Sequence, residues 1–201
     1  EISIDYSNLT NMERKNTLFF EFHGSESSNK ESIDIAEEIS KNNNGTKFKW
    51  AQTTEERNKI WQARHDAYYS IKAQGNNIKV YVTDVCVPIS KLAECIKFAE
   101  ERIKEYGLRA PMVGHVGDGN FHCGIIYDPN KKEDHKMIRD FSNQLVEKAL
   151  SLDGTVTGEH GVGIQKKDYL LKEHPDNINL MKSIKKTIDP NNIMNPGKIF
   201  D

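Results

Sequence analysis

The 201-residue sequence has no long apolar run, few cysteines and almost no excess of charge of either sign. No stretch approaches the roughly 20 apolar residues that a membrane-spanning helix needs, so we expect no transmembrane segment in this chain. A net charge of −2 gives no general attraction to nucleic acid. The three cysteines are far apart with no Cys-x-x-Cys spacing, which favours free thiols in a reducing compartment.

Nucleotide-binding and targeting patterns are also missing. The sequence contains no GxGxxG and no glycine-rich phosphate loop, so the chain itself carries no nucleotide-binding signature. It begins at Glu1, without methionine and without a signal or transit pattern. We therefore expect that it is part of a longer protein.

What is present predicts an α+β fold. Charged residues make up 29% and hydrophobic residues 36% of the chain, a composition that suits a globular protein with a modest core. Hydrophobic periodicity predicts helices over 32–41, 53–73, 91–106, 131–152, 164–173 and 176–188, and strands over 17–22, 47–51, 78–87, 112–116, 121–127 and 155–157. Without a regular alternation of strands and helices, we expect helices packed on one face of a mainly antiparallel sheet.

The second of these helices carries a capping box and an unusual arginine. Thr53 and Glu56 have the capping-box spacing that begins a helix. Arg64 lies on the apolar stripe of that helix, where a charged group is costly unless it is paired or serves a ligand. The alternative is that Arg64 reaches past the helix edge to water or pairs with a carboxylate. The sequence leaves both interpretations open.

The segment GHVGDGNFHCGIIYDPN, residues 114–130, predicts a β-hairpin. Asp118-Gly119 is typical of a two-residue type I′ turn, which would place His115 opposite His122 and Gly117 opposite Asn120. Directly opposed residues have Cβ atoms roughly 4.5–5.5 Å apart on one face, so the two imidazoles could share a metal ion. Alternation turns Cys123 to the other face, and we do not count it as a ligand.

A second segment, GTVTGEHGVG at 154–163, holds Glu159 and His160 between glycines. With His115 and His122, Glu159 would complete a common three-ligand catalytic metal set with a position open for substrate or water. His160 would then be free to move a proton near neutral pH. Each histidine alone could be an ordinary surface or hydrogen-bonded residue, but the combination favours a metal or catalytic site.

Five segments in order carry a resemblance to a known family: WQARHDAYY, TDVCVPISKL, GHVGDGNFHCGI, GTVTGEHGVG and TIDPNNIMNPGKIF. Together they resemble the C-terminal half of FAD-linked 2-hydroxyacid dehydrogenases over residues 15–201. The branch that they resemble most is the mitochondrial-type, cytochrome-linked D-lactate dehydrogenases. Similar segments occur in glycolate oxidase flavin subunits and D-2-hydroxyglutarate dehydrogenases.

This resemblance implies an architecture and a set of cofactors. It implies a vanillyl-alcohol-oxidase-like flavoprotein whose ferredoxin-like, substrate-binding cap spans 1–152, and whose segment 153–201 packs against an FAD-binding domain outside this chain. FAD would be bound mainly by that domain, so the isolated chain should be inactive. A divalent metal, zinc or manganese, would complete the site. A mitochondrial location follows from the resemblance alone.

The resemblance also implies residue roles, namely His115, His122 and Glu159 as metal ligands, His160 as catalytic base, Arg64 and Asn120 at the substrate, and Asn195 near the flavin. The implied reaction oxidises a D-2-hydroxy acid such as D-lactate to a 2-oxo acid, with hydride transfer to flavin and an electron acceptor such as cytochrome c. The 2-hydroxyglutarate branch has a lysine at the position of Val82. An apolar residue there favours a small monocarboxylate.

Two functions of other classes remain open. A metal-dependent hydrolase would use the same His and Glu ligands to activate water and would need no flavin. A binding module would use the metal only to staple the hairpin, and a fourth protein ligand would then close the site.

Overall fold

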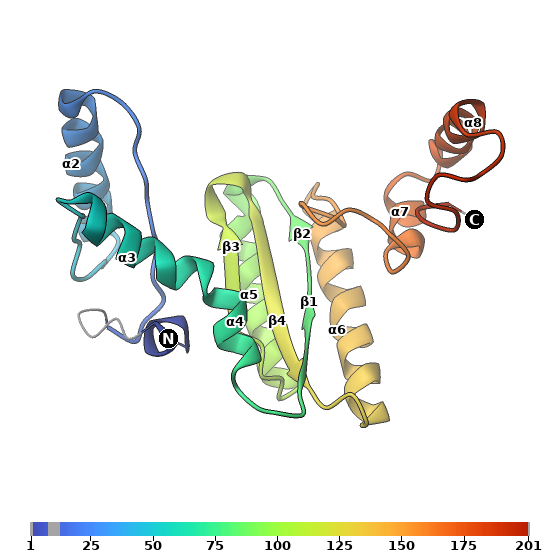
Figure 1. The fold of residues 1–201 in the computed structure, drawn as a ribbon, viewed down its shortest axis with the longest axis horizontal. Coiled ribbons are helices and arrows are strands. Elements are labelled where there is room, and N and C mark those ends of the chain that lie inside the picture. The colour runs from blue at the N-terminus through green and yellow to red at the C-terminus, as the bar shows by residue number, and fades with distance from the viewer. Residues whose placement is uncertain (1, 8–12, 201) are drawn as a thin grey trace. The chain divides into compact units, whose positions relative to one another are not determined.

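The structure, a computed structural model, describes residues 2–7 and 13–200 and divides into two compact units, Glu1–Ser70 and Ile71–Asp201 (Figure 1). The boundary that we expect after residue 152 is a different one, because it separates the substrate-binding cap from the segment that would pack on the FAD-binding domain. That boundary stays a prediction. Among the described residues, no helix has the length and hydropathy that are needed to cross a membrane.

The first unit is helical where it has regular structure. Its elements are α1 (Ile2–Tyr6), α2 (Glu26–Asn42), α3 (Thr54–His65) and the start of α4 (Ala67–Lys72). The capping box is confirmed: the Thr53 side chain accepts from the Glu56 backbone, and the Glu56 side chain accepts from the Thr53 backbone. The single helix expected over 53–73 is interrupted at Asp66, whose side chain bonds Gln62. Aspartate competes locally for hydrogen bonds and is therefore a weak helix-interior residue.

The strands expected over 17–22 and 47–51 are wrong, because neither segment forms a strand in the described structure. Both contain the aromatic residues that favour strands. In the structure Leu18 and Phe20 are 62% and 57% exposed, with no sheet face to pack on. A strand needs a neighbour that satisfies its N–H and C=O groups, and composition alone does not supply one.

The second unit is built on a four-stranded sheet in which every pairing is antiparallel. Its strands are β1 (Lys79–Val82), β2 (Val85–Cys86), β3 (Met112–His115) and β4 (Asn120–Tyr127). β4 is central. β1 and β2 follow one of its edges in a single register, and β3 pairs along the other edge.

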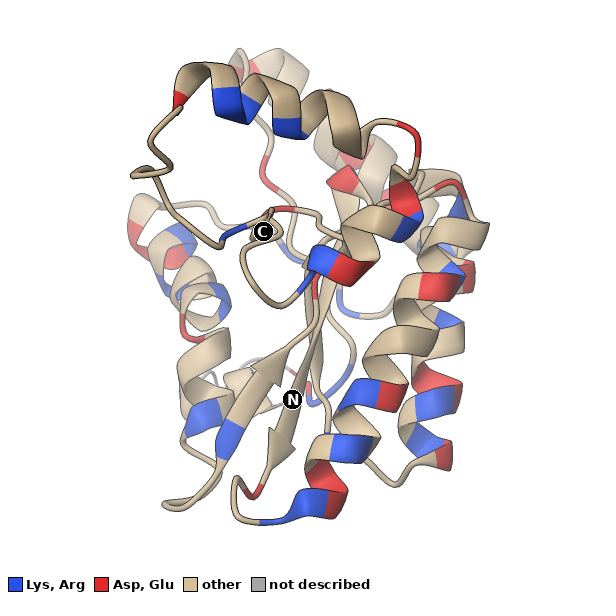
Figure 2. Ribbon diagram, turned by 90° about the vertical axis from the view of Figure 1, so that its right-hand side faces the viewer, with Lys and Arg blue, Asp and Glu red and all other residues tan. Residues whose placement is uncertain are grey.

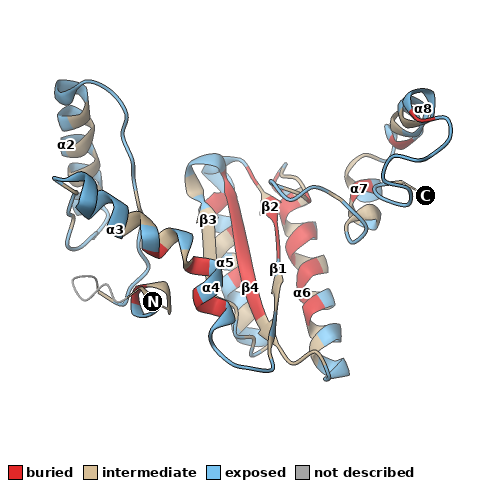
Figure 3. Cartoon of the chain, viewed as in Figure 1, coloured by how far each residue is buried: buried red, intermediate tan, exposed pale blue. Residues whose placement is uncertain are grey.

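Helices α5 (Ile89–Glu105) and α6 (Lys132–Ser151) pack together with this sheet and enclose the core (Figures 1 and 3). The core contains alternate residues of β4, the inward face of α5 and the inward face of α6, and its members include Phe121, Cys123, Ile125, Leu92, Cys95, Ala99, Ile138, Phe141, Leu145 and Ala149. The i, i+3, i+4 spacing of Ile138, Phe141, Leu145 and Ala149 predicts the inward face of α6, and their burial confirms it. The side chain of Cys123 lies in the core, as the alternation along the strand predicts. The α+β class, with its antiparallel sheet, is also confirmed.

The strand expected over 78–87 is broken at Thr83 and Asp84. The Thr83 hydroxyl accepts a hydrogen bond from the Cys123 backbone N–H at 2.9 Å, in place of a ladder carbonyl. Val82 pairs with Gly124 and Val85 with Phe121, so the register is unchanged across the break. The interruption is local, and it places Asp84 beside His122 of β4.

The expected two-residue turn is wrong. A 3-10 turn, η1 (Val116–Asp118), follows β3, and Gly119 adopts a left-handed conformation with φ 75°. His115 therefore pairs with Asn120, and His122 pairs with Val113. A Cβ on Gly119 would lie 1.9 Å from the carbonyl oxygen of Val87, so contact with the end of β2 requires glycine there.

The change of register still leaves the two histidines on one face. The observed pairing differs from the expected one by two residues, and side chains alternate between faces with a period of two. His115 and His122 are thus diagonal neighbours, which in antiparallel sheets are about 7–8 Å apart, instead of directly opposed.

The C-terminal part contains α7 (Lys167–Glu173) and α8 (Ile178–Ile188), both shorter than expected. The strand expected over 155–157 is reduced to a single bridge between Cys86 and Thr155. Asp189 follows α8, and its carboxylate accepts hydrogen bonds from the backbone N–H groups of Ile193 and Met194.

Candidate functional site

His122 lies at the centre of the candidate site, on β4, and is only 6% exposed. Its Nδ1 is 2.9 Å from the carbonyl oxygen of Thr83, which is acceptor-only, so Nδ1 carries the proton. Its Nε2 is 2.7 Å from Oε1 of Glu159. In the neutral ring, Nε2 then carries a lone pair, which faces the carboxylate oxygen of Glu159. Two acceptors at this distance need a proton or a cation between them.

Glu159 and His160 come from the glycine-flanked loop and both reach His122. The rings of His160 and His122 are edge-to-face with centroids 5.1 Å apart. Nε2 of His160 is 3.7 Å from the same Glu159 oxygen that approaches His122. The side chains of Glu159 and His160 are 47% and 58% exposed. The site is therefore a buried histidine with two partly exposed titratable groups around it.

Asp84 holds that loop in place. Its Oδ1 accepts from the backbone N–H of Glu159 at 3.2 Å, and its Oδ2 accepts from the backbone N–H of His160 at 3.1 Å. The Thr157 hydroxyl donates to Oδ2 at 3.1 Å, and Lys166 Nζ donates to it at 2.8 Å. The Asp84 side chain is 2% exposed. This carboxylate is a buried hub between the strand break and the loop.

The ionised form of Asp84 is stabilised. Burial by itself would raise its pKa, but the hydrogen bonds from Lys166, Asn120 and the His160 backbone, with the charge of Lys166, outweigh burial and hold the pKa well below its ordinary value. The carboxylate is thus charged at neutral pH, and Lys166 is the cation that compensates it.

Asn120 presents an unsatisfied acceptor. Its Nδ2 donates to Oδ1 of Asp84 at 3.0 Å, so the amide oxygen of Asn120 is the atom left to accept a hydrogen bond. Asn120 is 5% exposed, and its Oδ1 has no hydrogen-bond partner among the described residues. A buried orphan acceptor in a cluster of functional side chains is suited to a hydroxyl group, a water molecule or a cation.

Gly158 makes this arrangement possible. A Cβ at that position would lie 1.6 Å from Nδ2 of Asn120 and 2.8 Å from Oδ1 of Asp84. Only glycine therefore lets the loop approach β4 closely enough for the Asn120–Asp84 hydrogen bond.

The other sequence-predicted residues lie as follows. His115 is exposed, on the same face of the hairpin as His122. Asn195 is exposed in the closing loop. Arg64 lies on α3 of the first unit, so its assignment rests on the resemblance alone. Of the predicted residues, the structure brings together His122, Asn120, Glu159 and His160.

The donors at this site fit a divalent cation. His122 Nε2 and a Glu159 oxygen converge, and the other nitrogen of His122 is bound to a backbone carbonyl, the usual support of a metal-ligating histidine. The unsatisfied Oδ1 of Asn120 is a further oxygen in the same cluster. Imidazole and carboxylate together suit zinc or manganese.

An alternative ligand set is less suitable. Asp84, His122 and His160 each offer an atom within 4.8 Å of the others. Both oxygens of Asp84, however, already accept from several donors, and the nitrogen of His122 that is 3.8 Å from Asp84 is bonded to Thr83. Asp84 is therefore better suited to support the site than to bind an ion.

Asp84 and Lys166 are not among the residues predicted from the sequence. One signal was available for Asp84: it is the one charged residue inside the apolar run from Val80 to Val87, and a buried charge requires partners. Nothing local marks Lys166, since lysines are frequent in this chain. Its role appears only when the loop is folded against the strand break.

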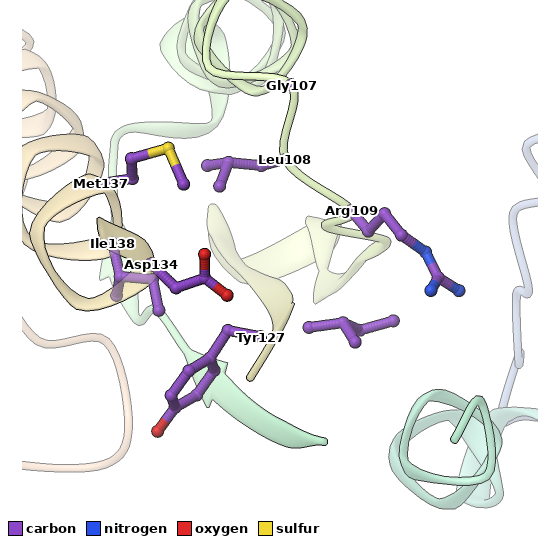
Figure 4. A pocket seen from close by; sticks show the side chains of 8 residues that line it. Gly107, Leu108, Arg109, Tyr127, Asp134, Met137 and Ile138 are labelled. Atoms are coloured by element: carbon purple, nitrogen blue, oxygen red, sulfur yellow. The ribbon is translucent and has the colours of Figure 1, made fainter. Parts of the chain in front are cut away.

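Two hollows lie elsewhere on the second unit. One of about 170 Å³ is at the Tyr127 end of β4, between the turn after α5 and the start of α6, and its lining includes Arg109, Asp134 and Met137 (Figure 4). The other, of about 550 Å³, is an open surface beside Lys132, His135, Lys136 and Arg139 of α6. Acidic and basic residues both occur on several of the helices (Figure 2), which fits the near-neutral net charge.

Comparisons with known proteins assign the chain to one family. The family model described as "FAD linked oxidases, C-terminal domain" matches residues 3–199. The chain is 45% identical over 186 residues to "Probable D-lactate dehydrogenase, mitochondrial" of Danio rerio, covering 92% of this chain and 37% of that protein. It is 40% identical over 199 residues to "D-lactate dehydrogenase (cytochrome), mitochondrial" of Arabidopsis thaliana, covering 98% of this chain and 35% of that protein.

A solved structure shares the fold. The 4-ethylphenol oxidase of Gulosibacter chungangensis, in its isoeugenol complex, superposes with a TM-score of 0.52 at 17% identity, covering 75% of this chain and 31% of that one. At this identity the likeness shows the fold alone. The chain spans little more than a third of the length of the two curated relatives, at 37% and 35%.

Proposed function

Because the chain belongs to the family of FAD-linked oxidase C-terminal domains, we propose that it is the substrate- and metal-binding part of a flavoprotein that oxidises D-lactate, or a similar D-2-hydroxy acid, to the 2-oxo acid. The names of the two relatives support this substrate class. They also support a mitochondrial location and, from the Arabidopsis protein, a cytochrome as electron acceptor.

Within that protein, 1–152 would form the cap over the substrate. The segment 153–201 would carry Glu159 and His160 and then return to the FAD-binding domain, with Asn195 near the flavin. FAD would be bound mainly by residues outside this chain, which is consistent with the absence of a GxGxxG motif.

His115, His122 and Glu159 would hold the divalent metal. The observation that carries this proposal is the 2.7 Å approach of His122 Nε2 to Oε1 of Glu159, while Nδ1 is bonded to Thr83. His115 lies on the same face of the hairpin and would turn toward the pair. Once bound, the metal would supply Lewis acidity toward the substrate hydroxyl, and the flavin would accept the hydride.

The remaining residues would bind the substrate and move its proton. Arg64 would hold the carboxylate in a charge-assisted, forked hydrogen bond. Asn120 would offer its Oδ1 to the substrate side of the site, because its Nδ2 is already engaged by Asp84. His160, adjacent to His122 and more than half exposed, would take the hydroxyl proton. Val82 would favour a small monocarboxylate over a second carboxylate group.

Substitution of His160 tests the proton-transfer step. In the full-length flavoprotein, His160→Ala should retain the bound flavin and metal but lower kcat for D-lactate by roughly 10²–10⁴, the usual effect of losing a positioned general base. Steady-state kinetics with D-lactate make the measurement. Near-normal turnover by a folded, metal-loaded variant would remove His160 from the reaction.

Substitution of Arg64 tests substrate binding. Loss of a charge-assisted hydrogen bond corresponds to about 1.5–3 kcal/mol, so Arg64→Ala should raise the KM for D-lactate roughly ten- to a hundredfold. The matched control is Arg57→Ala, also on α3, where the side chain pairs with Glu21. Unchanged kinetics in Arg64→Ala would contradict the assignment.

Metal removal separates the proposed enzyme from the two other classes. Chelation should abolish D-lactate oxidation by the full-length protein, and zinc or manganese should restore it. A metal-dependent hydrolase would instead hydrolyse esters or amides without flavin. A binding module would retain no oxidase activity in any form.

A further inference from the structure

Asp84 accepts hydrogen bonds from an unusually large set of donors. They come from β4, from the Glu159–His160 loop and from the segment before α7, and they are Asn120 Nδ2, Thr157 Oγ1, Glu159 N, His160 N and Lys166 Nζ. Three segments that are distant in sequence from Asp84 thus converge on one buried carboxylate. Asp84 lies in the strand break, between the last ladder pair of β1 and the first of β2.

Two of these donors are the backbone N–H groups of the neighbouring residues Glu159 and His160. The His160 N–H donates to Oδ2 at 3.1 Å, and the Glu159 N–H donates to Oδ1 at 3.2 Å with a longer contact to Oδ2 at 3.4 Å. Fixing two consecutive N–H groups fixes the backbone between them and therefore the directions of their side chains. The carboxylate of Glu159 is aimed at His122, and the ring of His160 meets the edge of the His122 ring. The relative placement of these side chains follows from the clamp on their backbone.

We propose that Asp84, with Lys166 as its counter-ion, is the positioning residue of the site: it clamps the Glu159–His160 loop so that one side chain faces the metal position and the other faces the substrate. This inference rests on the proposed function for the identity of the metal and substrate. Because both oxygens of Asp84 already accept from these donors, Asp84 would bind neither the metal nor the substrate. It acts through the two residues that it holds.

The two-oxygen geometry makes asparagine a sharp probe. In Asp84→Asn only one of the two side-chain atoms accepts. With the oxygen at the Oδ1 position the His160 N–H loses its acceptor, and with the oxygen at the Oδ2 position the Glu159 N–H keeps only its longer contact of 3.4 Å. The variant also leaves the Lys166 cation without its partner. The double variant Asp84→Asn/Lys166→Met removes that uncompensated charge but does not restore the clamp.

The chain offers a matched control. Asp189 is 5% exposed and also accepts from two backbone N–H groups, those of Ile193 and Met194, and from a lysine, Lys185. Asp189→Asn therefore removes a clamp of the same construction in another loop. It should lower Tm as Asp84→Asn does, without affecting the Glu159–His160 loop.

The experiment uses the full-length protein and two readouts. Amide hydrogen exchange of the metal-free protein follows the N–H groups of 159 and 160, and competition with a chelator gives the Kd for zinc and manganese. Asp84→Asn should lose protection at both amides by at least about tenfold, while β4 and α6 keep theirs. Its metal Kd should rise about 10–100-fold, the usual effect of losing a group that orients a ligand.

The double variant decides between positioning and stability. If Asp84 positions the loop, Asp84→Asn/Lys166→Met should recover part of the Tm but neither the amide protection nor the metal affinity. It also carries the test if Asp84→Asn fails to fold. Recovery of the Tm, the amide protection and the metal affinity together in the double variant would overturn the proposal. So would wild-type amide protection in Asp84→Asn with a metal Kd within about twofold of wild type.

The failure of this inference is distinguishable from the failure of the proposed function. If the wild-type protein neither binds the metals nor oxidises D-lactate, the proposed function is wrong, and amide exchange in the metal-free protein still tests the clamp. If the wild-type protein does both and the variants retain both, only the role of Asp84 is wrong.

Discussion

At the scale of single residues, the site depends on what Gly158 lacks. Asn120 and Asp84 occupy the space that a Cβ would take, with the Asn120 amide nitrogen only 1.6 Å from the ideal Cβ position. The Asn120 side chain is buried and bonded through Nδ2 to Asp84. Because the buried Asn120 side chain cannot move out into solvent, even a methyl group at position 158 must displace the loop or break the Asn120–Asp84 hydrogen bond.

Gly158→Ala should therefore impair the site more than the fold. We expect the Asn120–Asp84 hydrogen bond to break and the metal Kd to rise by roughly tenfold, since both groups support the site. Gly161→Ala is a useful comparison, because nothing lies within 4 Å of its Cβ position, although its φ of 73° adds backbone strain. Metal affinity and Tm of the two variants make the test. Wild-type metal affinity in the Gly158→Ala variant would contradict the close approach.

At the scale of elements, the turn after α8 shows how one carboxylate ends a helix. Asp189 is bound by Lys185 within α8 and by the N–H groups of Ile193 and Met194 after it. The hydrogen bond from Lys185, followed by those from the two backbone groups, lowers the pKa of Asp189 against the opposing effect of burial. Its charged form therefore stabilises the folded chain.

This shift predicts the pH dependence of stability. A lowered folded-state pKa means that the unfolded chain binds the proton more readily. The stabilisation should be complete above the ordinary carboxyl pKa of about 3.9 and should be lost as pH falls through the lowered value. Asp189→Asn should thus be less stable than wild type at pH 7, with a difference that shrinks in acid. Urea midpoints across this range make the measurement, and a constant difference would argue against the shift.

Also at this scale, locally coded elements could be predicted from the sequence, whereas those fixed by distant contacts could not. The capping box at Thr53 and the inward face of α6 follow from spacing along one helix, and both are confirmed. The prediction of a two-residue hairpin turn was wrong because Gly119 packs on the Val87 carbonyl, a contact between segments far apart in sequence. The strands expected over 17–22 and 47–51 failed because no described neighbour pairs with them.

The same division holds within the site. His122, Glu159, His160 and Asn120 stand out by residue type and glycine spacing, and the structure gathers them. The expected opposition of His115 and His122 was wrong by two residues, and alternation alone kept both on one face. Asp84 and Lys166 could not be paired from the sequence, because 82 positions separate them and only the folded loop brings them together.

At the scale of the whole molecule, the two compact units differ in how much they bury. The large core cluster belongs to the second unit, whereas the buried hydrophobic residues in the described part of the first unit are Ile4, Ala63 and Ala67. Since burial of apolar surface is the main favourable term in folding, the first unit should be the less stable of the two when the chain unfolds.

The chain happens to carry a separate optical or chemical label in each unit. Both tryptophans, Trp50 and Trp61, lie before residue 71, and all three cysteines lie after it. Burial raises the pKa of Cys95 to about 11 and that of Cys123 to about 12, so these thiols should react with alkylating reagents only when the second unit opens. During a denaturant titration, tryptophan fluorescence should change first and thiol reactivity should rise later. Coincident transitions would instead mean that the two units unfold as one, and no mutation of the protein would be needed to tell the difference.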